Sequence, residues 1–77
     1  MSTKRTTVDL VGIRCPMPIV VLNDEMAGLS GGAELEATAD DPAFAPDVTA
    51  WCELTGHALV SLDHDGRVVT AVIRKAA

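Results

Sequence analysis

Large aromatic residues are almost absent from this chain of 77 residues, which has no tyrosine, one phenylalanine (Phe44) and one tryptophan (Trp51). A folded core must therefore be built mainly from aliphatic side chains. No apolar run approaches the roughly 18 residues that a membrane-spanning helix needs, so no membrane span is predicted. The polar segment 1–5 is not followed by an apolar stretch, so no signal peptide is predicted either. These two absences favour a cytoplasmic protein.

Cysteine and basic residues are also scarce. The two cysteines, Cys15 and Cys52, form neither a C-x-x-C pair nor the basis of a disulfide scaffold. Six Lys and Arg residues face eleven Asp and Glu residues, which gives a net charge of −5. This balance argues against direct binding of nucleic acid, which requires a basic surface. It is compatible with docking onto a more basic protein.

The length of the chain predicts one small domain. A domain of this size buries only about 60% of its unfolded surface, so the core is thin. A hydrophobic content of 48% is nevertheless sufficient for a compact fold. We assign residues 6–77 to a single domain and residues 1–5 to a flexible N-terminal tail.

Hydrophobic periodicity predicts four strands and two helices. The strands are expected over 6–11, 34–39, 58–62 and 67–75, with a two-residue hairpin turn at Asp65-Gly66. One helix is expected to run to about Leu29, and the second is expected to end before Gly56. Each helix has a single apolar stripe and can cover only one face of a sheet. The sequence therefore predicts an α+β fold, a two-layer βαβαββ sandwich with a mixed four-stranded sheet and two helices on one face.

The start of the second helix is marked by Asp40-Asp41-Pro42, with an Asp as N-cap and Pro at the first position. Because Pro46 would lie too deep in a regular helix that begins at Pro42, we expect the regular helix to begin near Pro46. Asp40 and Asp41 are candidates for capping or partner contact. Catalysis by the pair is disfavoured, since capping already accounts for one of them. The expected buried stripe consists of Phe44, Val48, Trp51, Cys52 and Thr55.

The most informative segment is Arg14-Cys15-Pro16-Met17-Pro18, which lies between the first strand and the first helix. Its two prolines are tolerated only in a first helical turn, so the helix begins at Pro16 or Pro18. Cys15 is then at a helix N-terminus, beside unpaired N–H groups. That position and the neighbouring Arg14 could lower the pKa of the thiol and make it nucleophilic.

A buried structural cysteine is the alternative interpretation of Cys15, but it would not require two flanking prolines. Met17 could contact a partner or pack on the loop. No metal site is predicted. The methionines of the helix have core spacing, and His57 and His64, seven residues apart in a strand, should lie on opposite faces.

The chain resembles the TusA/SirA-like family of small sulfur carriers over about residues 7–75. The matching segments include the C-P-x-P stretch Cys15-Pro16-Met17-Pro18, preceded by Val8-Asp9-Leu10, Gly12 and Arg14. They also include Ala39-Asp40-Asp41-Pro42-Ala43, Trp51-Cys52, Gly56-His57-x-Leu59 and Ile73-Arg74-Lys75. The family fold is the βαβαββ sandwich already expected from periodicity. Many relatives carry Glu where this chain has Met17.

The resemblance implies that Cys15 accepts sulfane sulfur as a persulfide and relays it, with Arg14, Pro16, Met17 and Pro18 in support. The implied partners are a cysteine desulfurase or rhodanese-like donor and a downstream relay protein. The implied pathways are tRNA thiolation, molybdenum-cofactor sulfuration and sulfur oxidation. The protein would be a sulfurtransferase-type carrier, with no cofactor other than the carried sulfur. One alternative is a non-catalytic binding or regulatory module with Cys15 unused. Another is a redox pair of Cys15 with Cys52, which the helical position of Cys52 disfavours.

Overall fold

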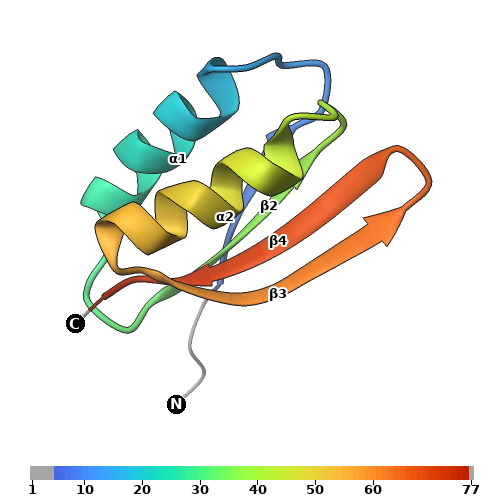
Figure 1. Ribbon diagram of the computed structural model, residues 1–77. Helices are drawn as coiled ribbons and strands as arrows, with labels where there is room; N and C mark the ends of the chain where they lie inside the picture. The colour runs from blue at the N-terminus through green and yellow to red at the C-terminus, as the bar shows by residue number, and fades with distance from the viewer. Residues whose placement is uncertain (1–4, 77) are drawn as a thin grey trace.

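A computed structural model describes residues 5–76 of the chain. Its elements are β1 (Thr6–Leu10), α1 (Met17–Ala27), β2 (Glu34–Ala39), α2 (Phe44–Thr55), β3 (Ala58–Asp65) and β4 (Val68–Arg74). The sheet has the order β1-β2-β4-β3, in which β1 and β2 are parallel and the other pairs are antiparallel. Both helices cover the same face of the sheet (Figure 1). The predicted two-layer βαβαββ sandwich is therefore confirmed.

The parallel pairing of β1 with β2 determines where the functional segments meet. Leu10 pairs with Ala39, so the two strands end at the same edge of the sheet. The segments that follow them, 11–16 and 40–43, leave from that edge and lead into α1 and α2. Two stretches of chain that are far apart in sequence are thereby brought side by side.

The core lies between the helices and the sheet. Leu35, Ala37 and Ala39 of β2 are fully buried, as the alternation of polar and apolar residues in that strand predicted. The two aromatic side chains, Phe44 and Trp51, are buried on α2 and lie between the layers, which is also as predicted. The remaining buried helix residues are Pro18, Leu22, Met26, Val48 and Cys52. Thr55, the last residue of the expected stripe, is exposed.

The starts of the helices differ from the predictions in detail. Helix α1 begins at Met17, with Pro16 as its cap and Pro18 in its first turn. Helix α2 begins at Phe44, so the prediction that it begins near Pro46 is wrong. Pro46 is the third residue of α2, where the missing N–H would have had no partner within the helix. The N-cap residue is Ala43, so the prediction of an Asp at this position is also wrong.

The β3–β4 hairpin turns one residue later than predicted. Asp65 still belongs to β3 and pairs with Val68, which leaves Gly66 and Arg67 as the loop. Gly66 has φ +62 at the first loop position. Glycine adopts this conformation without steric strain, and tight hairpin turns call for it there.

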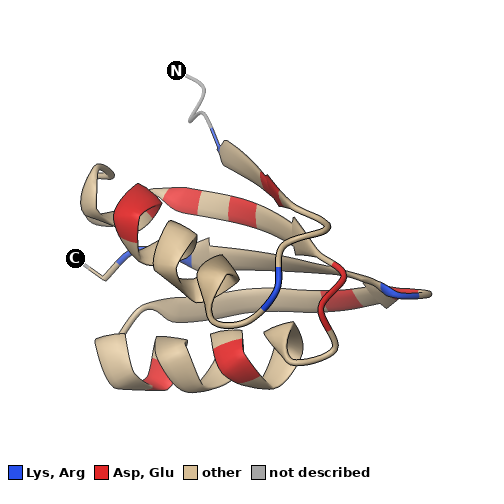
Figure 2. Cartoon of the chain, turned by 90° about the horizontal axis from the view of Figure 1, so that it is seen from above, with Lys and Arg blue, Asp and Glu red and all other residues tan. Residues whose placement is uncertain are grey.

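Charged side chains lie mainly on the outer surfaces. Acidic residues are found on both helices and along β2, whereas basic residues are few (Figure 2). Arg5, which the sequence assigned to the tail, forms ion pairs with Glu34 and Glu36, at 3.0 Å and 3.2 Å. Residues 1–4, the rest of the predicted tail, and residue 77 of the predicted domain lie outside the described residues. Neither described helix has the length and apolar character needed to cross a membrane.

Candidate functional site around Cys15

The two cysteines have opposite environments. Cys15 is exposed in the loop between β1 and α1, whereas Cys52 is buried in the core side of α2. This arrangement confirms the predicted placement of both thiols. Only Cys15 is accessible to a reagent or to the thiol of another protein.

The N-terminus of α1 does not present free N–H groups to the Cys15 sulfur, so that prediction is wrong. Pro16 and Pro18 have no N–H, and the N–H of Cys15 donates to Asp41 Oδ2 at 2.6 Å. The other N–H groups of the first turn are used within the backbone of the described segment. They bind as Met17 N to Arg14 O at 3.0 Å, Ile19 N to Pro16 O at 3.2 Å and Val20 N to Pro16 O at 3.3 Å.

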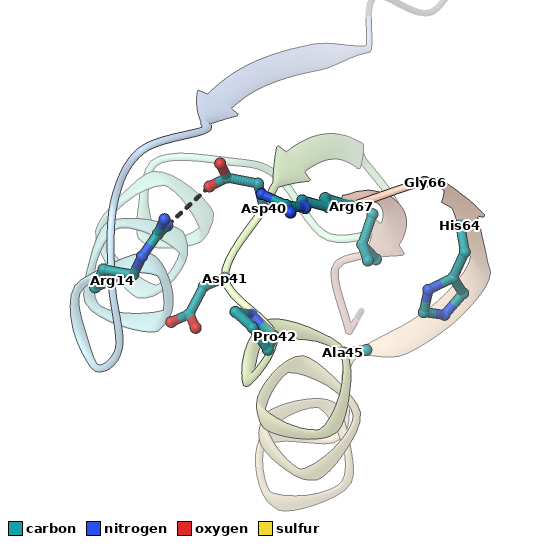
Figure 3. A pocket seen from close by; sticks show the side chains of 9 residues that line it. Arg14, Asp40, Asp41, Pro42, Ala45, His64, Gly66 and Arg67 are labelled. Atoms are coloured by element: carbon teal, nitrogen blue, oxygen red, sulfur yellow. Dashed lines mark hydrogen bonds and ion pairs between the residues drawn. The ribbon is translucent and has the colours of Figure 1, made fainter.

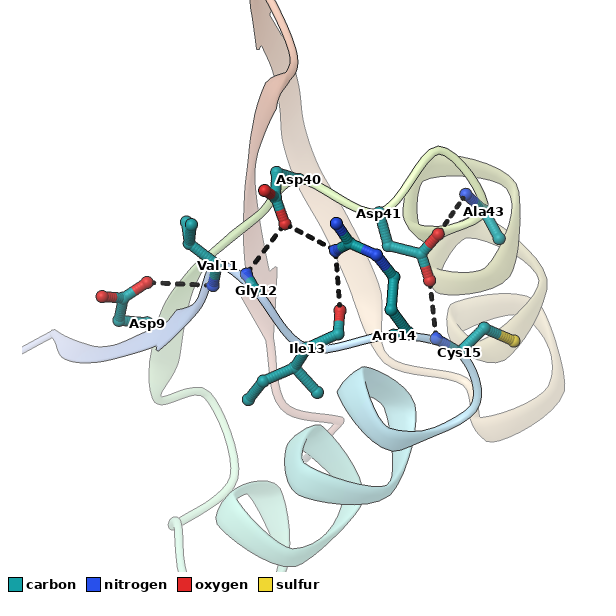
Figure 4. A network of polar contacts seen from close by, with 9 residues as sticks. All are labelled: Asp9, Val11, Gly12, Ile13, Arg14, Cys15, Asp40, Asp41 and Ala43. Carbon is teal, nitrogen blue, oxygen red and sulfur yellow. Dashed lines mark hydrogen bonds and ion pairs between the residues drawn. The ribbon is translucent and has the colours of Figure 1, made fainter.

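Arg14 also does not contact the sulfur. Its Nη1 donates to Asp40 Oδ1 at 2.8 Å, and the same oxygen accepts the N–H of Gly12 at 2.9 Å. Figure 4 shows the Cys15 side chain pointing away from the Arg14 guanidinium. The N–H of Gly12, followed by Arg14, holds the pKa of Asp40 below its ordinary value. Arg14 and Asp40 therefore hold the loop together, and this geometry does not support a contribution of Arg14 to the acidity of the thiol.

Asp41 is a buried carboxylate that joins the cysteine loop to the start of α2. Besides the Cys15 N–H, it accepts the N–H of Ala43 on Oδ1 at 3.1 Å (Figure 4). Its side chain thus satisfies two backbone donors from different segments. Being only 7% exposed, Asp41 offers little surface for partner contact. The two neighbouring aspartates hold the loop in place.

Asp47 is the functional residue that sequence reasoning missed. The Cys15 thiol donates a hydrogen bond to Asp47 Oδ2, with the sulfur 3.1 Å from the oxygen. This bond, followed by partial burial and by the charges of Asp47 and Asp41, raises the pKa of the thiol above its ordinary value. The direction of this shift is opposite to the lowering that the helix start and Arg14 could have produced. Because β1 and β2 are parallel, both helices start at one edge, which was the signal that could have placed Asp47 there.

Two shallow hollows with mainly apolar linings lie between the helices. Cys15 lines only the first, and the second also includes Asn23 and Asp24. The first, of about 350 Å³, includes Cys15, Asp47, Trp51 and Leu54 in its lining. The second, of about 330 Å³, continues along α1 and shares Pro16, Ile19 and Trp51 with the first. Val20 and Leu54, two exposed apolar side chains, line these hollows, and Leu54 is 87% exposed. Met17, the first residue of α1, is exposed as well. An exposed thiol beside such a surface is suited to contact with another protein.

A third hollow, of about 410 Å³, lies between the Asp40–Pro42 segment and the β3–β4 hairpin (Figure 3). Arg14, His64 and Arg67 contribute to its lining, but Cys15 does not.

Within residues 5–76, no three His, Cys, Asp or Glu side chains are grouped so that they could hold a metal ion. His57 instead packs its ring against Trp51, with centroids 5.3 Å apart.

The chain is similar to known proteins in both sequence and fold. The family described as sulfurtransferase TusA has a model that matches residues 6–75. A putative sulfur carrier protein of Aquifex aeolicus (strain VF5) is 31% identical over 71 residues, which are 92% of this chain and 36% of the relative. The chain thus spans about a third of the length of that relative. A solved SirA-like protein of Desulfitobacterium hafniense shares the fold, with a TM-score of 0.80 at 22% identity and coverage of 94% and 99% of the two chains.

Proposed function

Because this chain belongs to the sulfurtransferase TusA family, we propose that it carries sulfane sulfur as a persulfide on Cys15 and hands it to an acceptor protein. The observation that supports this proposal best is the contrast between the two thiols. Cys15 is exposed on a loop held by side-chain hydrogen bonds, whereas Cys52 is buried. A carrier requires one accessible sulfur in a defined position.

The proposed transfer is a thiol exchange without net oxidation or reduction. The Cys15 thiol loses its proton, and the thiolate attacks the outer sulfur of a persulfide on the donor. A new S–S bond forms at Cys15 while the S–S bond of the donor breaks. The donor cysteine leaves as a thiolate and takes up a proton. Release to the acceptor is the same reaction with Cys15 as the leaving group.

The residues that hold the Cys15 loop fix its position and take no part in the transfer itself. Arg14 and Asp40 fix one side of the loop, and Asp41 holds the backbone of Cys15 itself. Pro16 and Pro18 shape the turn into α1. A fixed backbone lowers the entropic cost of bringing two sulfurs together in line, because fewer bonds must be immobilised on binding.

The partners proposed are a cysteine desulfurase or rhodanese-like donor and a downstream relay protein. The apolar hollows beside the thiol and the exposed Met17, Val20 and Leu54 are a suitable surface for them. A donor must place its own sulfur over Cys15, so it must cover at least the first of these hollows. The sulfur would then pass toward tRNA thiolation, molybdenum-cofactor sulfuration or sulfur oxidation.

Mass spectrometry of the intact protein after incubation with a cysteine desulfurase and cysteine tests this proposal. The wild type and Cys52→Ser should gain a sulfur atom, which a reducing agent removes. Cys15→Ser, which keeps the size of the side chain but lacks a thiol, should gain none.

Two results would contradict the carrier proposal in different ways. If Cys15→Ser gains sulfur as readily as the wild type, Cys15 is not the acceptor. If the wild type gains no sulfur from a desulfurase or a rhodanese-like donor, the protein is better explained as a non-catalytic binding module. The raised pKa of the free thiol is the observation that favours this second candidate.

A further inference from the structure

Asp47 occupies an unusual position for a carboxylate. It is the one charged residue that lines the 350 Å³ hollow, whose other lining residues are Cys15 and five apolar residues. No basic side chain in the described part of the chain forms an ion pair with it, since the ion pairs found there involve Glu34, Glu36 and Asp40. A lone carboxylate at an apolar surface is a strong attachment point for a cation.

The groups that face the Cys15 sulfur are negative. Asp47 comes from α2 and accepts the hydrogen bond of the thiol, with its Oδ2 3.1 Å from the sulfur. Asp41 comes from the segment before α2, and the charges of both aspartates disfavour the thiolate. Asp41 has its oxygens on the N–H groups of Cys15 and Ala43. Arg14, the cation of the cysteine loop itself, is bound to Asp40. Asp47 is thus the acid at the sulfur that a partner can still neutralise.

We propose that Asp47 acts as a latch, which keeps the Cys15 thiol protonated in the free protein and is released by a basic side chain of the sulfur donor. This inference rests on the proposed carrier function. The donor would carry a Lys or Arg next to its persulfide cysteine, on a segment otherwise apolar enough to cover Trp51 and Leu54. Its cation would pair with Asp47 in place of the thiol hydrogen bond.

The latch has a simple proton balance. When the cation binds, Asp47 stays ionised but no longer stabilises the protonated thiol, and the thiol proton passes to water. The donor thiolate that leaves after transfer takes up a proton, so none is consumed. In the absence of a donor, the protonated thiol resists the oxidants that attack exposed thiolates. The latch would therefore restrict the reaction to partners with the right charge.

The first experiment measures the pH dependence of Cys15 alkylation by iodoacetamide, a small neutral reagent. Asp47→Asn should lower the apparent pKa of the thiol and make alkylation several-fold faster at neutral pH. Asp47→Ser, a second neutral residue that suits a first helical turn, should behave in the same way. Glu53→Gln removes one charge from the exposed face of the same helix and should match the wild type. Unchanged or slower alkylation in both Asp47 variants would overturn the proposal.

The second experiment tests the cation with three small disulfides at low salt. Cystamine is positively charged, bis(2-hydroxyethyl) disulfide is neutral and dithiodipropionate is negatively charged. Each exchanges with Cys15 to give a mixed disulfide and a free thiol. The wild type and Glu53→Gln should react fastest with cystamine and slowest with dithiodipropionate. In Asp47→Asn the ratio of the cystamine rate to the dithiodipropionate rate should fall several-fold. An unchanged ratio would show that Asp47 does not select for a cation.

Neither experiment uses a donor protein or a carried sulfur. If the latch variants behave as expected but the wild type gains no sulfur from a desulfurase, the latch holds and the carrier function fails. If sulfur transfer succeeds but the Asp47 variants alkylate like the wild type, the carrier function holds and the latch is wrong.

Discussion

The two cysteines of this protein show how the same shift in acidity arises from two different causes. The hydrogen bond to Asp47, followed by partial burial and by the charges of Asp47 and Asp41, raises the pKa of Cys15 in an exposed loop. Burial alone raises the pKa of Cys52 inside the core. The first cause can be removed by a partner that binds Asp47, whereas the second persists as long as the protein is folded. Only the thiol that is restrained by charge can be switched on at a docking surface.

The surroundings of the two thiols are polar at Cys15 and apolar at Cys52. The Cys15 loop is held by carboxylates that accept backbone N–H groups and pair with Arg14. Cys52 is held by apolar packing with the buried cluster between the helices and the sheet. One region should therefore respond to changes of charge and the other mainly to changes of volume.

Alkylation of the native protein should show the largest difference between the two regions. Cys15 should react at the rate of an accessible thiol, whereas Cys52 must wait for an opening of the structure. If that opening requires about 3 kcal/mol, Cys52 should react more than about a hundredfold more slowly. Peptide mapping after brief treatment with iodoacetamide measures both rates. Comparable alkylation rates at Cys15 and Cys52 would contradict the proposed difference between the two thiols, because the core would then not protect Cys52.

Removal of the buried carboxylate should test how the Cys15 region is held. Asp41→Ala leaves the N–H groups of Cys15 and Ala43 without their acceptor. The loss of hydrogen bonds to a charged group should reduce the free energy of unfolding by about 3 kcal/mol. Asp9→Ala, which removes a single bond from an exposed carboxylate to Val11, should cost about 0.5 kcal/mol. Urea unfolding would give both values, and equal effects would contradict a special role for Asp41.

The sequence was sufficient to predict the layers of the fold because its patterns are local. Alternation within 34–39 gave the bounds of β2, and apolar stripes placed both helices on one face. The errors lie at the ends of elements, where two local signals compete. The start of α2 was placed too late because Pro46 was treated as a helix breaker, although a first turn has no need of its N–H.

The candidate site was predictable only where its residues are neighbours in the sequence, because sequence patterns report local structure. Cys15 and its prolines are contiguous, so their position at a helix start could be read directly. The partners of that segment are not contiguous. Asp47 lies 32 residues from Cys15, and Asp40 lies 26 residues from Arg14. The parallel pairing of β1 with β2 brings the two segments together, so that each aspartate meets its partner. Proximity in the sequence therefore suggested Arg14 only as a candidate neighbour of the sulfur, whereas its partner in the structure is Asp40.

Acid should weaken the Cys15 region before it affects the packing around Cys52. In this region the pKa of Asp40 is lowered by the N–H of Gly12 and by Arg14. At the opposite end of β2, the pKa of Glu34 is lowered by Arg74 and Arg5, so acid should weaken that end as well. A lowered pKa in the folded state contributes stability above the unfolded value, about 3.9 for Asp and 4.3 for Glu, and this stability is lost as the pH falls through the folded pKa. The free energy of unfolding should therefore decline below about pH 4.

Urea unfolding from neutral pH to about pH 2 measures this decline. Asp40→Asn, which cannot ionise, should be less stable at neutral pH and show a flatter decline. Cys52→Ala, which alters packing alone, should shift the whole curve without changing its slope. An identical slope in Asp40→Asn and the wild type would show that Asp40 contributes no pH-dependent stability.

Added salt should have the smallest effect on the alkylation rate of Cys15. The direction of that effect shows whether negative or positive charge dominates at the sulfur. If the negative charges of Asp47 and Asp41 dominate, screening should stabilise the thiolate and moderately accelerate alkylation by iodoacetamide between about 0.01 M and 1 M salt. Asp47→Asn should show less of this acceleration, and slow alkylation of the buried Cys52 should show none. A rate that falls with added salt would mean that positive charge dominates. The field of Arg14 and the helix N-terminus would then outweigh the two aspartates, and the thiol would be activated before any partner arrives.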